Sequence, residues 1–187
     1  MELQKNKADE FLAFRRALTE ESDRGCALFA AAYLDEALGE LLRASFVASK
    51  EMGEELFEGT APLATFSSRI KLAFYLGKIS RACRGDFDLI RKIRNDLAHS
   101  AELVSFDTPS VADRCRNLSF SHHTKDARPR GHFTSAASAI LAKIHALTII
   151  STAPEPPTDD RPSEKMKQEA RDQAENMLQE VLKRASE

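Results

Sequence analysis

The sequence predicts an all-α protein, a helical bundle followed by a Pro-rich linker and a C-terminal amphipathic helix. Apolar residues recur at intervals of three and four along almost every patterned segment, which is the spacing of one helix face. No segment shows convincing strand alternation, and seven Gly and seven Pro in 187 residues are too few for a turn-dense all-β fold. A chain of this length can bury roughly 70% of its unfolded surface, enough for its own core.

Two helices are expected before residue 50. The first covers residues 9–20. The second covers residues 22–48 and begins at Ser22 or Asp23, since either side chain can accept a backbone N–H at a helix start. Its apolar residues keep helical spacing: Ala27, Ala30, Leu34, Leu38 and Leu41. Its many alanines let neighbouring helices approach closely.

A break at residues 59–62 separates these helices from a third, which begins near residue 65. Apolar residues cover two of its faces, which predicts a central place in the bundle. The third helix is expected to end at Gly85, a typical C-cap, and Asp86 is expected to cap the next helix, over residues 87–99.

Two more helices complete the predicted bundle. Thr108 and Pro109 have the pattern of an N-cap followed by proline at the first helical position, so a helix is expected from there to about Leu118. A polar, basic connection over residues 119–131 leads to a further helix over residues 133–150.

The remaining sequence predicts an appendage. Residues 151–163 contain four prolines and no apolar pattern, which indicates a semi-rigid linker between a domain over residues 8–150 and a tail over residues 164–187. The tail has the pattern of an amphipathic helix over residues 164–185. Its apolar stripe is narrow, so it needs a partner surface, either in its own bundle or on another chain.

Composition excludes several classes of protein. A net charge of −2 argues against a generally basic nucleic-acid binder but leaves room for a local basic patch. Three cysteines without CxxC spacing indicate neither a disulfide framework nor a zinc site, and Cys26 is expected to be a small buried apolar side chain. The longest apolar run, Cys26–Leu34, is too short to span a membrane, and the polar N-terminus lacks a secretory signal. We therefore expect a cytoplasmic protein without membrane contact.

The most informative segment is Leu89–His99. On a helical wheel, Arg94 lies about 40° from the core-facing Ile90, where a guanidinium is costly unless it is paired and hydrogen-bonded. Asp35 and Glu36 interrupt the apolar run of the second helix. They are candidate partners for Arg94 or for Arg69, and a buried arginine that braces two helices is one interpretation.

Asn95 and His99 lie one turn apart on the far side of the same helix, with Arg91 near them. They can simply close the end of the helix. Alternatively, Arg94, Asn95 and His99 form a site that handles phosphates, because histidine titrates near neutral pH and arginine presents a permanent fork of donors.

Other candidate sites carry weaker signals. His122, His123 and His132 fall in an irregular basic loop without cysteine or carboxylate ligands at fixed helical spacing, so no metal is expected. The basic stretch 114–132 could contact RNA, DNA or an acidic partner. No Walker, GxGxxG, HExxH or GxSxG motif occurs, so we expect no cofactor and find no case for a familiar nucleotide-dependent or hydrolytic enzyme.

Two resemblances add to these observations. Residues 94–99 resemble the R-x4-6-H pattern of HEPN-type helical domains. A longer set of segments resembles the mannitol operon repressor-like (MltR/MtlR) family, in register over roughly residues 8–120 and without the tail after Ser151. These segments are Glu21–Ala27, Ala31–Asp35, Phe66–Ala73, Leu76–Ser80 and Ile90–His99. Four polar residues within them are expected to be structural or partner-binding: Arg24, Asp35, Arg69 and Arg91.

The mannitol repressor-like resemblance implies an all-helical repressor of a sugar-alcohol operon that has no recognised DNA-binding domain. The residues agree, because no helix-turn-helix with a basic, exposed second helix is evident in the sequence. A protein partner and a homo-oligomer are therefore expected, and direct DNA binding is not. A non-catalytic scaffold or antitoxin-like binding module is a further alternative.

The HEPN resemblance implies a metal-independent endoribonuclease or toxin that cleaves RNA at a dimer interface. His99 would act as general acid or base, Arg94 would stabilise the phosphorane and Asn95 would orient the phosphate. On an unbroken helix Arg94 and His99 point about 140° apart. A shared site therefore needs the helix to end near Ala98 or a second subunit to contribute.

Overall fold

The computed structural model describes residues 2–99, 104–157 and 160–185 and divides into two units, the first ending at Pro154 and the second beginning at Glu155. All regular elements in these ranges are helices, which confirms the all-α fold class. In chain order they are α1 Glu2–Glu20, α2 Asp23–Arg43, the π-helix η1 Gly53–Phe57, α3 Phe66–Tyr75, α4 Arg81–His99, α5 Pro109–Arg116, α6 Pro129–Ile150 and α7 Glu164–Ala185.

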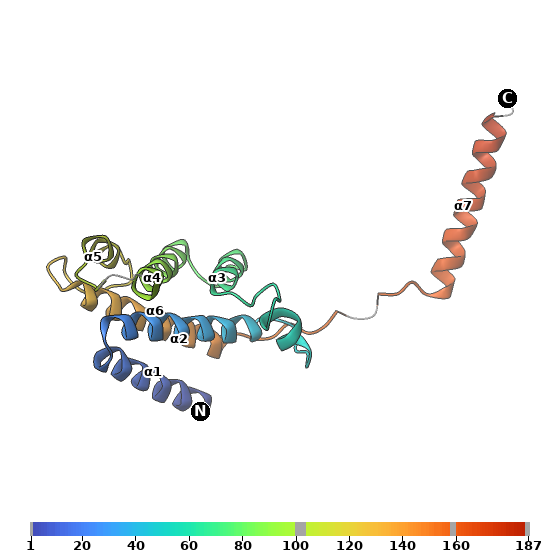
Figure 1. Cartoon of the computed structure of the whole chain (residues 1–187). Coiled ribbons are helices and arrows are strands. Elements are labelled where there is room, and N and C mark those ends of the chain that lie inside the picture. Colours follow the sequence, from blue (N-terminus) through green and yellow to red (C-terminus); the bar gives the residue numbers. More distant parts are fainter. Residues whose placement is uncertain (1, 100–103, 158–159, 186–187) are drawn as a thin grey trace. The chain divides into compact units, whose positions relative to one another are not determined.

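The first unit is built around two helices, α2 and α6, which lie side by side (Figure 1). Helix α1 packs against one side of this pair, and α3, α4 and α5 cover the other side, where they are seen nearly end-on. Because α2 contacts α1, α3, α4 and α6, it is buried on most of its circumference, and its alanines and Gly39 allow close packing there. The third helix was expected to be central; instead α3 is short and packs against α2 and α4.

The boundary between α3 and α4 differs from the prediction. Helix α3 ends at Tyr75, and the chain turns at Gly77, whose φ of 70° lies in the left-handed region that glycine adopts without strain. Helix α4 then starts at Arg81, where the Ser80 hydroxyl accepts a hydrogen bond from the backbone N–H of Cys83 at 3.2 Å. Gly85 therefore lies inside α4 rather than at a helix end, and the prediction of a break there is wrong.

Asp86 is a buried anchor and not a helix cap. The residue is 1% exposed, and its carboxylate accepts hydrogen bonds from the backbone N–H groups of Ser119 at 2.9 Å and Phe120 at 2.8 Å. These two groups follow α5 and have no helical partner, so a charged acceptor replaces the water that they would otherwise bind. Asp86 thus fixes the connection after α5 onto α4.

Several helix ends also depart from the expected positions. Helix α1 starts at Glu2 rather than at residue 9, α2 ends at Arg43 rather than at residue 48, and α6 starts at Pro129 rather than at residue 133. Proline suits the first turn of α6 because its missing N–H would have no partner there. The cap at Ser22 is confirmed, since its side chain accepts from the N–H of Gly25 at 3.1 Å.

The start of α6 is fastened to the turn between α1 and α2. The Arg130 guanidinium donates to an Asp23 carboxylate oxygen at 2.7 Å, to the Leu18 carbonyl at 3.0 Å and to the Glu21 carbonyl. The other oxygen of Asp23 accepts from the N–H of Phe106 at 3.0 Å. One carboxylate therefore joins segments from three distant parts of the sequence.

Helix α6 is long and apolar enough to span a membrane, with a mean hydropathy of 1.5. The sequence expectation considered only the longest apolar run and did not identify this helix. Phe133, Ile140, Leu141 and Ile144 of this helix are fully buried, and α6 packs against α1, α2 and α5. Its apolar composition is therefore that of a core helix.

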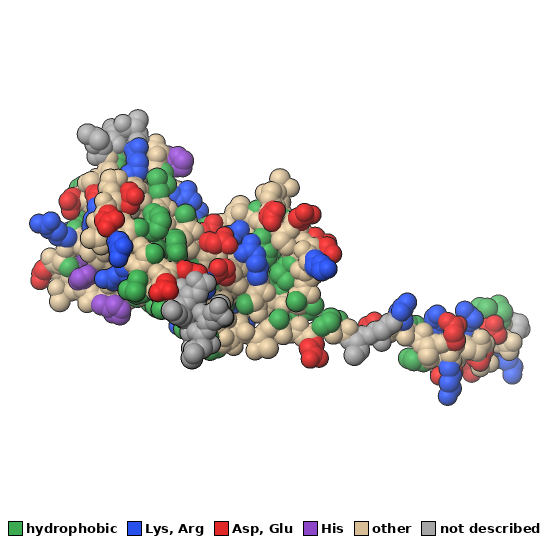
Figure 2. Space-filling view, turned by 90° about the horizontal axis from the view of Figure 1, so that it is seen from below, with side chains coloured by type: hydrophobic (Ala, Val, Ile, Leu, Met, Phe, Trp, Pro, Cys, Tyr) green, Lys and Arg blue, Asp and Glu red, His purple; other side chains and the backbone are tan. Residues whose placement is uncertain are grey.

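The second unit consists of the proline-containing segment and α7. The apolar stripe predicted for this helix is exposed within the unit, and Figure 2 shows hydrophobic and oppositely charged side chains interleaved on it. Its large exposed apolar residues are Met166, Met177, Leu178, Val181 and Leu182.

Candidate functional site

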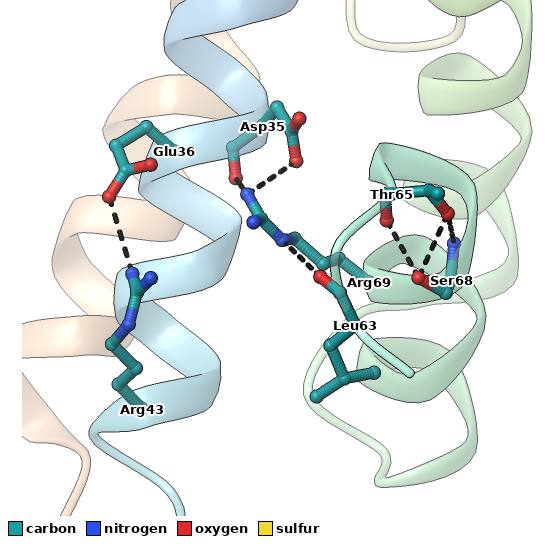
Figure 3. Close-up of polar contacts among 7 residues, drawn as sticks. All are labelled: Asp35, Glu36, Arg43, Leu63, Thr65, Ser68 and Arg69. Carbon is teal, nitrogen blue, oxygen red and sulfur yellow. Dashed lines mark hydrogen bonds and ion pairs between the residues drawn. The ribbon is translucent and has the colours of Figure 1, made fainter. Parts of the chain in front are cut away.

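Arg69 is the buried arginine that braces two helices. Its Nε donates to the Leu63 carbonyl at 2.8 Å, and its Nη1 donates to the Asp35 carboxylate at 2.8 Å and to the Asp35 carbonyl at 3.3 Å (Figure 3). Helix α3 positions it, because Thr65 caps that helix by accepting from the N–H of Ser68 at 3.2 Å. Asp35, one of the two acids expected to pair, thus joins α2 to α3.

Arg94, the other arginine considered as a partner of Asp35, lies on α4. It is half-buried, and its guanidinium makes no hydrogen bond within the described residues, although it interacts electrostatically with Asp35. Burial raises the pKa of Asp35 above its ordinary value, and the positive charges of Arg69 and Arg94 oppose that rise. Glu36, the other acid predicted to pair, contacts Arg43 at 3.2 Å (Figure 3).

A second arginine packs beside this brace. The guanidinium carbon of Arg43 lies 4.3 Å from the centre of the Phe57 ring, and that of Arg69 lies 5.6 Å from it. Gly39 of α2 makes room for both, since a Cβ there would stand 3.2 Å from Arg43 Nη1 and 3.3 Å from Arg69 Nη1. The π-helix that carries Phe57 therefore closes the end of the bundle over two cations.

The structure brings together two of the three residues predicted to form a catalytic site. Asn95 and His99 line a surface pocket between α4 and the start of α5, and Arg94 does not line it. Asp96, which also lines the pocket, accepts a hydrogen bond from Arg114 of α5. Helix α4 continues through His99, so the three side chains do not converge within one chain; residues 100–103 lie outside the described residues.

The two other residues singled out for structural or partner contacts lie on separate helices. Arg24 is exposed in the first turn of α2. Arg91 is half-buried on α4, with its guanidinium 3.7 Å from the Asp88 carboxylate, and its Nε is buried without a hydrogen bond. Neither lines the pocket that holds Asn95 and His99.

A pocket of about 380 Å³ between α1, α2 and α6 was not predicted from the sequence. Phe29, Tyr33 and Ala37 of α2 form its apolar wall. Its polar residues are Glu10, Glu36, Glu40 and His145. One face of α2 carries Tyr33, Glu36 and Glu40 at spacings of three and four, so the residues that α2 contributes to the pocket could have been identified from the sequence. The residues that α1 and α6 contribute could not.

Lys7 pairs with two carboxylates that line this pocket. Its Nζ lies 2.8 Å from Glu10 and 2.6 Å from Glu40. Burial alone would lower the pKa of Lys7, but its contacts with Glu10 and Glu40 raise the pKa above the ordinary value. The Nε2 of His145 is 3.8 Å from Glu10, and burial together with the charge of Lys7 lowers the pKa of His145 against the pull of the two glutamates.

We expect His145 to make stability depend on pH. Because its pKa is lower in the folded chain than in the unfolded chain, the unfolded chain binds more protons between the two values. The stabilising contribution is therefore present above about pH 6.5 and is lost as the pH falls. We expect the free energy of unfolding, measured in urea between about pH 5.5 and 7.5, to rise less steeply with pH for His145→Gln than for the wild type. Equal slopes would contradict this assignment.

The remaining predicted residues do not form a metal centre. His132 is buried with its Nδ1 2.9 Å from the Ser121 hydroxyl, and its ring centre lies 6.0 Å from that of His123. Within the described ranges no group of three His, Cys, Asp or Glu residues is placed to hold a metal. Cys26 is fully buried, as expected, and burial raises the pKa of its thiol to about 11.

Comparison with known proteins relates this chain to one family. A family model described as mannitol repressor (MtlR) matches residues 16–185, so the match includes the linker and α7, which the resemblance in sequence had left out. One chain of the crystal structure of the MtlR–HPr complex from Escherichia coli shares the fold, with a TM-score of 0.60 and 22% identity over 71% of this chain and 99% of that chain. No curated protein matches. The chain belongs to the mannitol repressor family.

Proposed function

We propose that this protein regulates transcription of a sugar-alcohol operon of the mannitol type through contacts with a protein partner rather than through a DNA-binding domain. Membership in the mannitol repressor family carries the regulatory role. The fold shared with a chain of the Escherichia coli MtlR–HPr complex supports a protein partner, and HPr is the first candidate. We expect the protein to act in the cytoplasm and as a homo-oligomer.

The pocket between α1, α2 and α6 is the surface that we assign to this partner. Phe29 and Tyr33 offer aromatic area at its wall, and aromatic side chains supply much of the binding energy at protein interfaces. The carboxylates of Glu10, Glu36 and Glu40 also line the pocket. Lys7 pairs with Glu10 and Glu40, and Arg43 pairs with Glu36, so three carboxylates face two cations and would favour a basic or hydrogen-bond-donating side chain of the partner.

Filling this pocket tests the assignment. Ala32 lines the pocket and is exposed on α2, so Ala32→Arg should place a long side chain among the carboxylates without disturbing the core. We expect its affinity for the HPr of the same genome, measured by isothermal titration calorimetry, to fall by about tenfold or more.

Ala13→Arg is the matched control, because Ala13 is exposed on α1 and does not line the pocket. It should bind HPr as the wild type does. Failure of the wild-type protein to bind HPr would reject this partner. If wild type and Ala32→Arg bind HPr equally, the pocket is not the binding surface, although HPr remains the partner.

The RNA-cleavage alternative is not favoured by any contact in the described residues. Arg94 does not line the pocket that holds Asn95 and His99, and a second subunit would have to supply the missing cation. The absence of cleavage of total RNA in EDTA, or equal cleavage by wild type and His99→Ala, would remove this alternative.

A further inference from the structure

The segment around the turn between α3 and α4 is basic and contains no acidic residue. Between Gly59 and Gly85 there are five basic residues and no Asp or Glu, in a chain whose acids outnumber its bases overall. Arg69 is buried in the brace described above. The other four basic residues lie on the end of α3, the start of α4 and the turn between these helices. We call the surface formed by Lys71, Tyr75, Leu76, Lys78, Arg81 and Arg84 the basic corner.

No carboxylate among the described residues neutralises the cations of the basic corner. The guanidinium carbon of Arg84 lies 4.7 Å from the centre of the Phe74 ring and 5.8 Å from that of Tyr75, and that of Arg81 lies 5.9 Å from Phe74. None of the four side chains forms an ion pair within the part of the chain that the structure describes. Arg69, Arg114 and Arg130, in contrast, each contact a carboxylate. Stacking on aromatic rings leaves the guanidinium edges available to an incoming acceptor.

Helix stability does not account for these arginines. Arg81 and Arg84 lie in the first turn of α4, which contains no acidic residue. The N-terminus of a helix carries a partial positive charge, so cations there oppose the helix dipole. The dipole and the two side chains therefore reinforce one another in a local positive potential.

The basic corner also contains two exposed side chains with apolar surface. Tyr75 is 77% exposed and Leu76 is 45% exposed, directly before the turn at Gly77. Exposed tyrosine beside arginine is the composition of binding hot spots between proteins. A surface that recognised only phosphates would not need Leu76, and the next turn of α4 carries Asp88, which would repel a nucleic-acid backbone.

We propose that the basic corner docks an acidic segment of a second protein, with carboxylates against Arg81 and Arg84 and an apolar side chain on Tyr75 and Leu76. Charge complementarity selects such a partner. A second copy fits less well, because a contact between the basic corner of one copy and the acidic pocket of another would be heterologous, whereas C2 dimers, the commonest homo-oligomers, pair the same surface of both copies. The basic corner shares no residue with the pocket assigned to HPr, so the two proposals can fail separately.

Fluorescence anisotropy with the full chain tests this proposal. The probes are a labelled peptide of Glu with interspersed Leu and Phe, the same peptide with Gln in place of Glu, and a short DNA duplex. We expect the wild type to bind the Glu peptide most tightly. Arg81→Glu and Tyr75→Ala should each weaken that binding roughly tenfold. For Arg81→Glu the Tm should stay equal or rise by about 2 °C, because an acid at a helix start suits the dipole.

Arg15→Glu, the same charge reversal at an exposed position of α1, should leave peptide binding unchanged. Three results would overturn the proposal. The first is that the wild type does not bind the Glu peptide. The second is that it binds the Gln peptide as tightly as the Glu peptide. The third is that it binds the DNA duplex more tightly than the Glu peptide and that Arg81→Glu abolishes the DNA binding. If a charge reversal lowers the Tm, Tyr75→Ala still tests the surface, because the Tyr75 side chain is largely in solvent and its removal should not destabilise the fold.

Discussion

Asp86→Ala is expected to lower the free energy of unfolding by about 3 kcal/mol, one of the two largest losses we anticipate for a single substitution. The substitution removes one buried carboxylate and leaves the backbone N–H groups of Ser119 and Phe120 without an acceptor. Each buried donor left without a partner costs about 1–3 kcal/mol. Water can reach part of this connection once the carboxylate has gone, which keeps the expected loss below the sum of the two.

Chemical unfolding followed by circular dichroism measures this loss. Asp88→Ala is the matched control, because Asp88 lies on the same helix, is partly exposed and faces Arg91 only at 3.7 Å. Its effect should stay within about 0.5 kcal/mol. Asp86→Asn, which keeps one carbonyl acceptor, should fall between the two variants. A loss for Asp86→Ala no larger than that for Asp88→Ala would show that the connection after α5 does not depend on this carboxylate.

Arg69→Met is the second substitution with a large expected effect and should lower the free energy of unfolding by about 3 kcal/mol. The substitution keeps most of the side-chain volume but leaves the Asp35 carboxylate and the Leu63 carbonyl without their donor. Burial already raises the pKa of Asp35, and without Arg69 that pKa should rise further. The variant should therefore gain stability relative to the wild type as the pH falls towards the range where Asp35 becomes protonated.

Two further variants separate the charge from the packing of Arg69. Arg43→Met removes an arginine that also stacks on Phe57 but whose partner, Glu36, is exposed, and it should cost about 1 kcal/mol or less. Asp35→Leu combined with Arg69→Met should recover part of the loss, since it removes the uncompensated carboxylate. If the double variant is less stable than Arg69→Met alone, packing rather than charge explains the position.

Helix spacing and the low content of glycine and proline were enough to predict the fold class. The error at the third helix has a simple cause: Gly85 was taken as the helix end, whereas the backbone has its positive φ at Gly77. Gly85 lies on the exposed side of α4, where a missing side chain leaves no hole in the core.

The arginine brace shows what a helical wheel omits. A wheel gives the direction of Arg94 relative to its own helix, but it does not tell how far a neighbouring helix extends. Asp35 was correctly identified as a partner, and Arg69 reaches it because α3 is short and starts beside α2. The pocket between α1, α2 and α6 was missed for a similar reason: Glu10, Glu40 and His145 come from three helices, and no local pattern joins them.

The fastening of Arg130 to Asp23 has a consequence during synthesis on the ribosome. The two residues are separated by 107 positions, and Arg130 lies in the first turn of α6, which packs against α1 and α2. At roughly 5–20 residues per second, the nascent N-terminal hairpin waits roughly 5–20 s before α6 has been translated. Its alanine- and leucine-rich face meets solvent or a chaperone during that interval, so newly made chains are most vulnerable to aggregation before the last core helix emerges.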